Sequence, residues 1–406
     1  MRAALLLLAL AAQPAAAQVD PESRQLIQLG LDRPVEGGPS TGYGFYYLNR
    51  PGVYKTDMTL RLVVAPVYMD SELGLSRIGP NTDLGIDLAG GGYAYGHNEI
   101  RQGGYVRGES FYGHGFSLGF SLYHLLNPAQ RIPMNAVVRA MTTAETFQPR
   151  ATTDPRFQVP ADFTQQSVRL GIRYGGFEPE IGANGLQLSG WYESQFRSRG
   201  FEYGFSDRTI RARSHLVWGN AAFAYTFPES GRYASAALTL GSSADTDRLN
   251  AWRIGGALPF VSEFPLSIPG YLYDEVTARS FAHFEARLLA PLDAARRVRM
   301  GFWGAAAVVD YQPGLEQAGA LNSGGGAIVQ LDSARRGWRL GFIYGYGIQA
   351  IRGSGRGAHS AGLTIQFNLG PSTWPLPLEP RAPVERPHGA LTPLDTIKSL
   401  PPVPKL

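Results

Sequence analysis

Few residues in this sequence have the types and spacing that catalysis requires. Gly115-Phe116-Ser117-Leu118-Gly119 matches the G-x-S-x-G pattern, in which a serine nucleophile sits on a sharp turn between a strand and a helix. Here Ser117 lies in the middle of a segment that alternates apolar and small residues, which predicts a strand without that turn. His124 follows seven positions later, so it should point to the opposite face of the same strand. These two residues do not predict a hydrolase.

The other motifs that could carry chemistry are equally weak. No two histidines stand at the spacing of a metal site, and the seven occur at positions 97, 114, 124, 215, 283, 359 and 388. The glycine-rich stretch 353–357 joins two expected strands, whereas a phosphate-binding loop is followed by a helix. No dinucleotide fingerprint or paired-carboxylate site stands out. We therefore expect no enzyme, no cofactor and no bound metal.

Composition narrows the class of protein further. The chain has 406 residues, of which 17% are charged and 50 are glycine, while about 25% charged residues is usual for a soluble domain. A hydrophobic fraction of 44% is enough to build a core, which argues against general disorder. The absence of cysteine excludes a disulfide scaffold and a cysteine nucleophile. A formal charge of +4 gives no reason to expect nucleic acid as a partner.

The N-terminal residues predict export. Arg2 is followed by a short apolar run over 3–12, and Ala15-Ala16-Ala17 has the small residues of a cleavage site. We interpret 1–17 as a secretory signal peptide. No later stretch approaches the roughly 18 consecutive apolar residues of a transmembrane helix. The sequence predicts an exported chain that does not cross a membrane with helices.

Long segments of period-two alternation are the main structural signal. In 115–123, Phe116, Leu118, Phe120 and Leu122 share one face, and glycine and serine occupy most of the other. The segments 167–174, 338–349 and 360–369 repeat this pattern. The polar face contains glycine, serine, threonine, asparagine and arginine, with little lysine or glutamate. The apolar face is rich in aromatic residues.

The length of these segments favours strands that cross a membrane. Strands in soluble proteins have about 5–6 residues, whereas strands that span a bilayer need about 9–11 and alternate between lipid and lumen. The fold class we predict is therefore all-β, a transmembrane antiparallel β-barrel of 14–16 strands in the bacterial outer membrane. A periplasmic β-sandwich or propeller is the alternative.

The expected strands divide the chain into four parts. The parts are a signal peptide (1–17), a short N-terminal segment (18–40), the transmembrane barrel (41–370) and a proline-rich, unstructured C-terminal tail (371–406). The strands are expected at 41–49, 58–69, 83–95, 104–112, 115–124, 132–147, 163–176, 184–198, 210–227, 231–244, 276–290, 296–311, 322–332, 337–350 and 359–369, with a doubtful one at 73–79. Short turns such as 229–231 and 291–293 should face the periplasm, and the longer 148–162 and 245–275 should be extracellular loops.

The stretch from Arg253 to Leu292 is the most informative. It contains Arg253-Ile254-Gly255-Gly256, then Pro269-Gly270-Tyr271, and then a strand with Glu285, Arg287 and Pro291-Leu292. This order resembles the outer-membrane assembly and translocation superfamily of BamA/TamA-like, bacterial surface antigen barrels. There, an "L-G-G … R-G-Y" loop precedes the twelfth of sixteen strands, which reads "E-x-R-x-P-L". Four expected strands follow 276–290, as the resemblance requires, and Val308-Val309-Asp310 is similar to the "F-x-D" of the thirteenth strand.

The resemblance implies a set of site residues. They form a family motif and lumen loop made of Gly255, Gly256, Gly270, Tyr271, Glu285, Arg287 and Asp310. By parity, His283, Glu285 and Arg287 should face the lumen together. Pro269 stands where the family has the loop arginine that docks on a lumenal carboxylate, so Glu285 or Asp310 would pair with Arg287, Arg299 or Arg253 instead. Because 18–40 is too short for a periplasmic POTRA domain, we expect a POTRA-less branch.

Three functions follow from these features. The resemblance implies insertion or translocation of proteins or lipids across the outer membrane, through a weak seam between the first and last strands. The alternative is a passive or anion-preferring, porin-like channel, because five arginines are expected to line the lumen: Arg169, Arg173, Arg287, Arg299 and Arg339. A third interpretation is a membrane anchor whose tail binds a periplasmic partner. We expect a monomer in contact with outer-membrane lipid.

Overall fold

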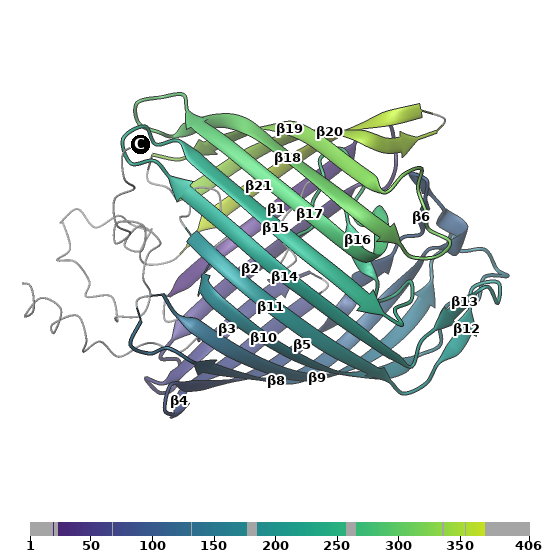
Figure 1. The fold of residues 1–406 in the computed structure, drawn as a ribbon, viewed down its shortest axis with the longest axis horizontal. Helices are drawn as coiled ribbons and strands as arrows, with labels where there is room; N and C mark the ends of the chain where they lie inside the picture. Colours follow the sequence, from purple (N-terminus) through teal and green to yellow (C-terminus); the bar gives the residue numbers. More distant parts are fainter. Residues whose placement is uncertain are drawn as a thin grey trace, which may run out of the picture.

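Figure 1 shows the computed structural model, which describes residues 19, 23–66, 68–130, 132–176, 185–256, 265–334, 337–353 and 355–369. The expected signal peptide (1–17) and proline-rich tail (371–406) lie outside the described residues. Within the described residues, the single helix is the three-residue 3-10 helix η1 (Arg107–Glu109), and no helix is long and apolar enough to span a membrane.

The described residues form a closed antiparallel barrel of sixteen strands. Each strand pairs with the next along the chain, and the last strand, β21, pairs with the first, β1. The barrel strands are β1 (Arg24–Pro34), β2 (Thr41–Pro51), β3 (Met58–Ala65), β4 (Tyr68–Gly79), β5 (Thr82–His97), β8 (Phe111–Leu125), β9 (Met134–Pro149), β10 (Phe163–Gly176), β11 (Gly185–Arg197), β14 (Arg213–Thr226), β15 (Tyr233–Ala244), β17 (Val276–Pro291), β18 (Val298–Tyr311), β19 (Leu321–Asp332), β20 (Trp338–Arg352) and β21 (Gly355–Asn368).

The predicted alternation sets the two faces of the wall. In β8, Phe116 and Phe120 are more than half exposed on the outside, while Ser117 and Ser121 are buried on the inside. The same pattern gives the barrel an apolar outer surface. It includes Leu118, Val168, Leu170, Ile172, Phe284, Leu288, Phe302, Phe342 and Tyr344, each at least 40% exposed. Such a surface suits hydrocarbon, where closure also matters because an open edge would leave backbone groups unpaired.

The structure corrects three strand assignments. β1 lies within 18–40, the stretch that was expected to stay outside the barrel. The expected strands 104–112 and 115–124 are replaced by one strand, β8, because Gly113 and Gly115 continue the ladder with β9 instead of forming a turn. The expected strand 58–69 divides into β3 and the start of β4 at Pro66, since proline cannot donate to a ladder.

The two ends of the barrel differ in the length of their connections. One end, which we call the turn end, carries the short connections 80–81, 227–232 and 292–297. The opposite end, the loop end (right in Figure 1), carries 98–110, 150–162, 198–212 and 245–275. Two short strand pairs lie within the long connections of the loop end: β6 (Ile100–Arg101) with β7 (Gly104–Tyr105), and β12 (Phe201–Tyr203) with β13 (Arg208–Ile210). The expected periplasmic turns therefore share one end, and the two expected extracellular loops share the other.

Candidate functional site

Part of the connection between β15 and β17, residues 245–275, folds into the barrel. We call it the inner loop, of which 245–256 and 265–275 are described. Its strand β16 (Trp252–Ile254) pairs with residues 276–278 of β17 and so extends the ladder where β15 ends. Ile254, Ile268 and Tyr271 are at most 1% exposed and pack against inward residues of β17, β18, β20 and β21. The loop occupies part of the lumen, where the resemblance implied that Gly255, Gly256, Gly270 and Tyr271 lie.

The tip of the inner loop lies on a wall of glycine backbone. Gly324 of β19 with Gly345 and Gly347 of β20 form what we call the glycine floor. A Cβ atom on Gly324 would lie 2.2 Å from the carbonyl oxygen of Pro269, and one on Gly345 would lie 2.7 Å from the nitrogen of Gly270. Any side chain on the floor would therefore displace the loop. The absence of side chains allows backbone to approach backbone.

Gly270, on the inner loop, has as little room for a side chain as the glycines of the floor. Its φ of +81° is a conformation that favours glycine, and an added Cβ would lie 2.0 Å from the nitrogen of Gly347 and 2.5 Å from the carbonyl oxygen of Ala358. Its N–H donates to Ser360 Oγ at 3.2 Å. Gly270 therefore attaches the inner loop to β20 and to β21.

Two more hydrogen bonds hold the inner loop to the wall. His283 Nε2 of β17 donates to the carbonyl oxygen of Ser267 at 2.9 Å, and this imidazole is 1% exposed. The hydroxyl of Tyr271 donates to Asn322 Oδ1 of β19 at 3.3 Å. The contacts of the loop thus extend from β17 to β21.

A buried ion pair fixes the end of the inner loop. Glu275 is 2% exposed and receives two hydrogen bonds from the guanidinium of Arg352, at 2.8 and 2.9 Å. Its carboxylate also accepts the N–H of Leu272 at 2.6 Å. Arg352 reaches the lumen because β20 shifts register between Gly347 and Ile351, which turns the residues after the shift to the opposite face. This bidentate pair joins the inner loop to the wall, with the carboxylate on the loop and the guanidinium on β20.

The residues proposed from the sequence fall into two groups. Gly255 and Gly256 have φ values of +132° and +83° at the point where the inner loop leaves β16. Glu285 and Arg287 lie on the inward side of β17 and form an ion pair of 2.6 Å. Asp310, in contrast, is not a lumen residue.

The outward position of Asp310 follows from the strand that carries it. In β18, Trp303, Ala305, Ala307 and Val309 are the buried inward residues, so Asp310 has the opposite parity. It is exposed near the loop end and pairs with Arg279 at 2.9 Å instead of Arg253, Arg287 or Arg299. The motif alone suggested a lumenal Asp310, whereas its parity relative to Trp303 places it outside.

The lumenal arginines are largely compensated by carboxylates. Arg169 pairs with Glu193 at 2.7 Å, Arg339 with Asp332 at 2.8 Å, and Arg287 with Glu285. Arg173 lies over the ring of Trp191. The expected anion preference of the lumen required uncompensated positive charge, and these three pairs remove much of it.

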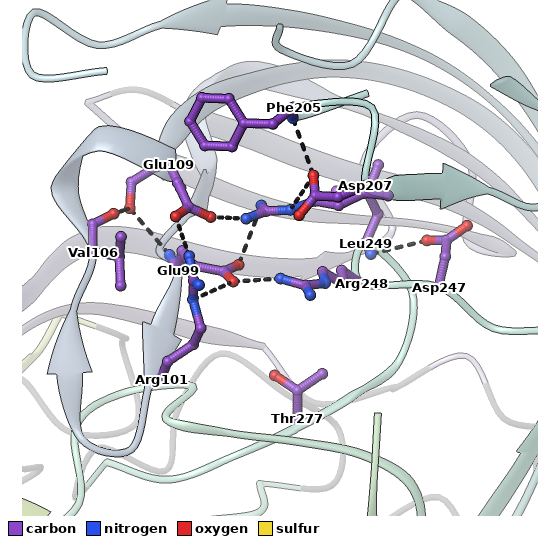
Figure 2. Close-up of polar contacts among 12 residues, drawn as sticks. Glu99, Arg101, Val106, Glu109, Phe205, Asp207, Asp247, Arg248, Leu249 and Thr277 are labelled. Atoms are coloured by element: carbon purple, nitrogen blue, oxygen red, sulfur yellow. Dashed lines mark hydrogen bonds and ion pairs between the residues drawn. The ribbon is translucent and has the colours of Figure 1, made fainter. Parts of the chain in front are cut away.

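An ionic cluster joins the loops at the loop end, as Figure 2 shows. This rim cluster consists of Glu99, Arg101, Glu109, Arg208 and Arg248, which come from the connections 98–110, 198–212 and 245–275. Arg208 contacts both Glu99 and Glu109, and Arg248 contacts Glu99. Burial lowers the pKa of Arg208 to about 10, which leaves it charged at neutral pH. The cluster ties three loops into one cap.

Asp247 and a hydrophobic cluster add further contacts between the loops of this cap and the barrel wall. Asp247 pairs with Arg197 of β11, both nearly fully buried, and accepts the N–H groups of Arg211 and Leu249. The cluster consists of five aromatic residues and one isoleucine: Phe111, Phe147, Phe157, Phe163, Tyr203 and Ile210. The cap therefore has an apolar core of its own.

A cavity of about 600 Å³ lies between the inner loop and the wall formed by β9, β10, β11, β14 and β15. Trp252, Arg253 and Asp274 line it from the loop side. Burial raises the pKa of Asp274 to about 6, an effect that nearby Arg253 partly offsets.

The serine and histidine singled out in the sequence do not lie together. Ser117 points inward and shares a hydrogen bond of 2.9 Å with Thr143 Oγ1, whereas His124 points outward and contacts Thr82. No group of three or more histidine, aspartate and glutamate side chains in the described ranges could hold a metal ion.

The residues that join the inner loop to the wall were not predicted. Glu275 of the loop and Arg352, Ser360 and Asn322 of the wall belong to no recognised motif. One signal was present for the glycine floor: 324–326 is a run of three glycines, and Gly345 and Gly347 alternate with aromatic residues. Glycine on an inward face indicates a close approach of another backbone.

Comparisons with solved structures identify the fold. The class is a closed sixteen-stranded barrel whose loop before the twelfth strand enters the lumen. This fold is similar to CdiB from Acinetobacter baumannii (TM-score 0.58, 10% identity, 88% of this chain and 64% of that chain), CdiB from Escherichia coli (0.53, 11%, 86% and 64%), and BamA from Haemophilus ducreyi lacking POTRA domains 1-3 (0.50, 10%, 84% and 70%).

The chain thus has the barrel fold of CdiB and BamA, and it spans less than two thirds of the length of each CdiB chain. No protein-family model matches the sequence, and no curated protein matches it.

Proposed function

We propose that this chain is a non-enzymatic outer-membrane barrel of the BamA/TamA-like superfamily that assists the insertion or translocation of proteins or lipids. The observation that carries the proposal is the inner loop, which precedes the twelfth strand, enters the lumen and contacts strand β21. The apolar outer face supports a location in the lipid of the outer membrane, where the chain would act as a monomer. The fold shared with CdiB and BamA is consistent with this role.

The seam between β1 and β21 is where the barrel would open. It has nine register pairs, from Leu26 with Asn368 to Pro34 with Ser360. At the loop end it continues through Val35, whose N–H donates to the carbonyl oxygen of His359 at 2.9 Å. Because Ser360 also receives the N–H of Gly270, movement of the inner loop removes one support from the seam strand.

Locking the seam should stop the activity. Leu29 and Ile365 are directly opposite each other in the ladder, where Cα atoms lie about 4.5–5.5 Å apart, within the range of a disulfide. The variant Leu29→Cys/Ile365→Cys introduces the chain's only two cysteines. Two rates would be measured in proteoliposomes: the folding of a urea-denatured outer-membrane barrel and the exchange of a fluorescent phospholipid. We expect both rates to fall about tenfold or more in the oxidised variant. A reducing agent should restore both rates.

A second disulfide provides the matched control. Leu170→Cys/Tyr192→Cys joins two opposite, outward residues of β10 and β11, remote in the strand order from the seam. This variant should keep wild-type rates when oxidised. Equal rates for the locked and unlocked seam, in both assays, would contradict the proposed function.

The proposal also predicts a mostly closed pore. The inner loop fills part of the lumen, and three of the five expected lumenal arginines are paired with carboxylates. Purified protein in a planar bilayer should show rare, brief openings with little preference between anions and cations. A steady, anion-selective conductance would instead support the porin-like function.

A further inference from the structure

The cavity beside the inner loop has the features of a ligand site. Its volume of about 600 Å³ is in the range of cavities that hold small molecules, and such sites combine aromatic surface with a few polar groups. We propose that this cavity binds a neutral saccharide. This inference goes beyond the proposed function and does not depend on it.

One side of the cavity is aromatic. Trp252 of the inner loop lies 5.4 Å from both the Trp218 ring of β14 and the Phe281 ring of β17, measured between ring centroids. All three rings line the cavity, and Trp252 is the one that is only partly buried. Flat aromatic surface of this kind can pack against the C–H face of a sugar ring.

Planar polar groups that are already held in place also line the cavity. Gln195 donates to Glu193 at 2.7 Å and accepts from Asn250 at 2.8 Å. Arg169 is held by Glu193, and its guanidinium lies over the Trp218 ring. Amide, guanidinium and carboxylate groups present neighbouring donors and acceptors, which match the adjacent hydroxyl groups of a sugar.

Two carboxylates retain capacity for hydrogen bonds. Glu145 of β9 points inward, and neither its side chain nor that of Asp274 receives a hydrogen bond from any residue in the described ranges. Carboxylates accept hydroxyl donors readily, so both could bind a ligand without breaking an existing contact.

The charge of the lining favours a neutral ligand. Three carboxylates (Glu145, Glu193 and Asp274) and three arginines (Arg169, Arg197 and Arg253) line the cavity, so their formal charges cancel. A strongly anionic or cationic ligand would leave charge uncompensated in a partly enclosed space. A polyhydroxylated ring satisfies donors and acceptors of both kinds.

Intrinsic fluorescence of the full chain in detergent tests the proposal. Glucose, galactose, rhamnose, N-acetylglucosamine and maltose would each be titrated to tens of millimolar, with tetramethylammonium chloride as the cationic probe. We expect a saturable change with at least one sugar and none with tetramethylammonium. Trp252→Leu should weaken sugar binding about fivefold or more, because it removes the aromatic surface. Glu145→Gln should weaken binding without disturbing any hydrogen bond of the wall.

Trp338→Leu is the matched control, because Trp338 lies on the outer face of β20, where it is 42% exposed. This variant should bind sugar as the wild type does. Calorimetry of the Glu145→Gln variant provides a readout that does not depend on tryptophan. Three results would overturn the proposal: no saturable response to any of the sugars, saturation by tetramethylammonium alone, or sugar binding that neither cavity variant alters.

Discussion

The Gly270→Ala variant should release the inner loop from the wall while the barrel remains closed. The new Cβ would lie 2.0 Å from the backbone nitrogen of Gly347, an overlap that only movement of the loop can relieve. Overpacking of this kind costs about 1–3 kcal/mol, and a non-glycine residue at this φ adds about 1–3 kcal/mol. We expect the described part of the loop near Gly270 to become protease-sensitive, and bilayer openings to become frequent.

Gly319→Ala is the control for this prediction. Gly319 has a φ of +107° in the connection between β18 and β19, and no atom lies within 4 Å of its virtual Cβ. This variant therefore has the free-energy cost of a positive φ at a non-glycine residue, but its Cβ overlaps no neighbouring atom. The gel mobility of unheated samples verifies that both barrels are folded. If Gly270→Ala resembled Gly319→Ala in proteolysis and conductance, close packing at the glycine floor would not be what holds the loop.

The Glu275→Ala variant should destabilise the docked loop by about 3–5 kcal/mol. It removes a carboxylate that is 2% exposed and leaves Arg352 buried without its partner, which is the costly way to break an internal ion pair. The measurement is the denaturant dependence of protease cleavage in the inner loop. The double variant Glu275→Ala/Arg352→Ala should recover part of the loss, because it no longer leaves an unpaired charge.

Asp310→Ala is a matched comparison within the same barrel. Its partner Arg279 is 47% exposed, so this surface pair is expected to contribute at most about 1 kcal/mol. Similar losses for Asp310→Ala and Glu275→Ala would mean that burial of the Glu275 pair has no special role in holding the loop.

Period-two alternation predicted the barrel together with the length of the segments and the composition of their two faces. The faces of β8, β10 and β21 follow the expected parity, and β20 follows it up to its register shift, because one side of each must be apolar. The predicted total of 14–16 strands includes the observed sixteen, but one expected strand was wrong and one real strand was missed.

The missed strand, β1, did carry a signal. Ile27, Leu29 and Leu31 alternate with Gln28 and other polar or small residues. The strand is nevertheless bordered by charge and proline, as in Asp32-Arg33-Pro34, which is typical of a connecting segment. Pairing with both β2 and β21 stabilises it, and that long-range contribution is not visible in a local pattern.

The candidate site was predictable only in part. The loop glycines and the inward direction of Glu285 and Arg287 follow from sequence order and parity. The partners of the inner loop do not, because Ser360 lies 90 positions from Gly270 and Arg352 lies 77 positions from Glu275. The inward direction of Arg352 also depends on a register shift that breaks the parity rule.

The glycine floor has a consequence for how the barrel is assembled. A strand that slips by two positions keeps its faces and most of its backbone bonds, so hydrophobicity alone discriminates weakly against that error. Such a slip of β20 would place Ile343 where Gly345 faces Pro269, or Gln349 where Gly347 faces Tyr271. The added side chain would then prevent the inner loop from packing against β20. The inner loop can therefore dock only when the last strands of the barrel have paired in the correct register. Docking of the loop thus selects the correctly closed barrel.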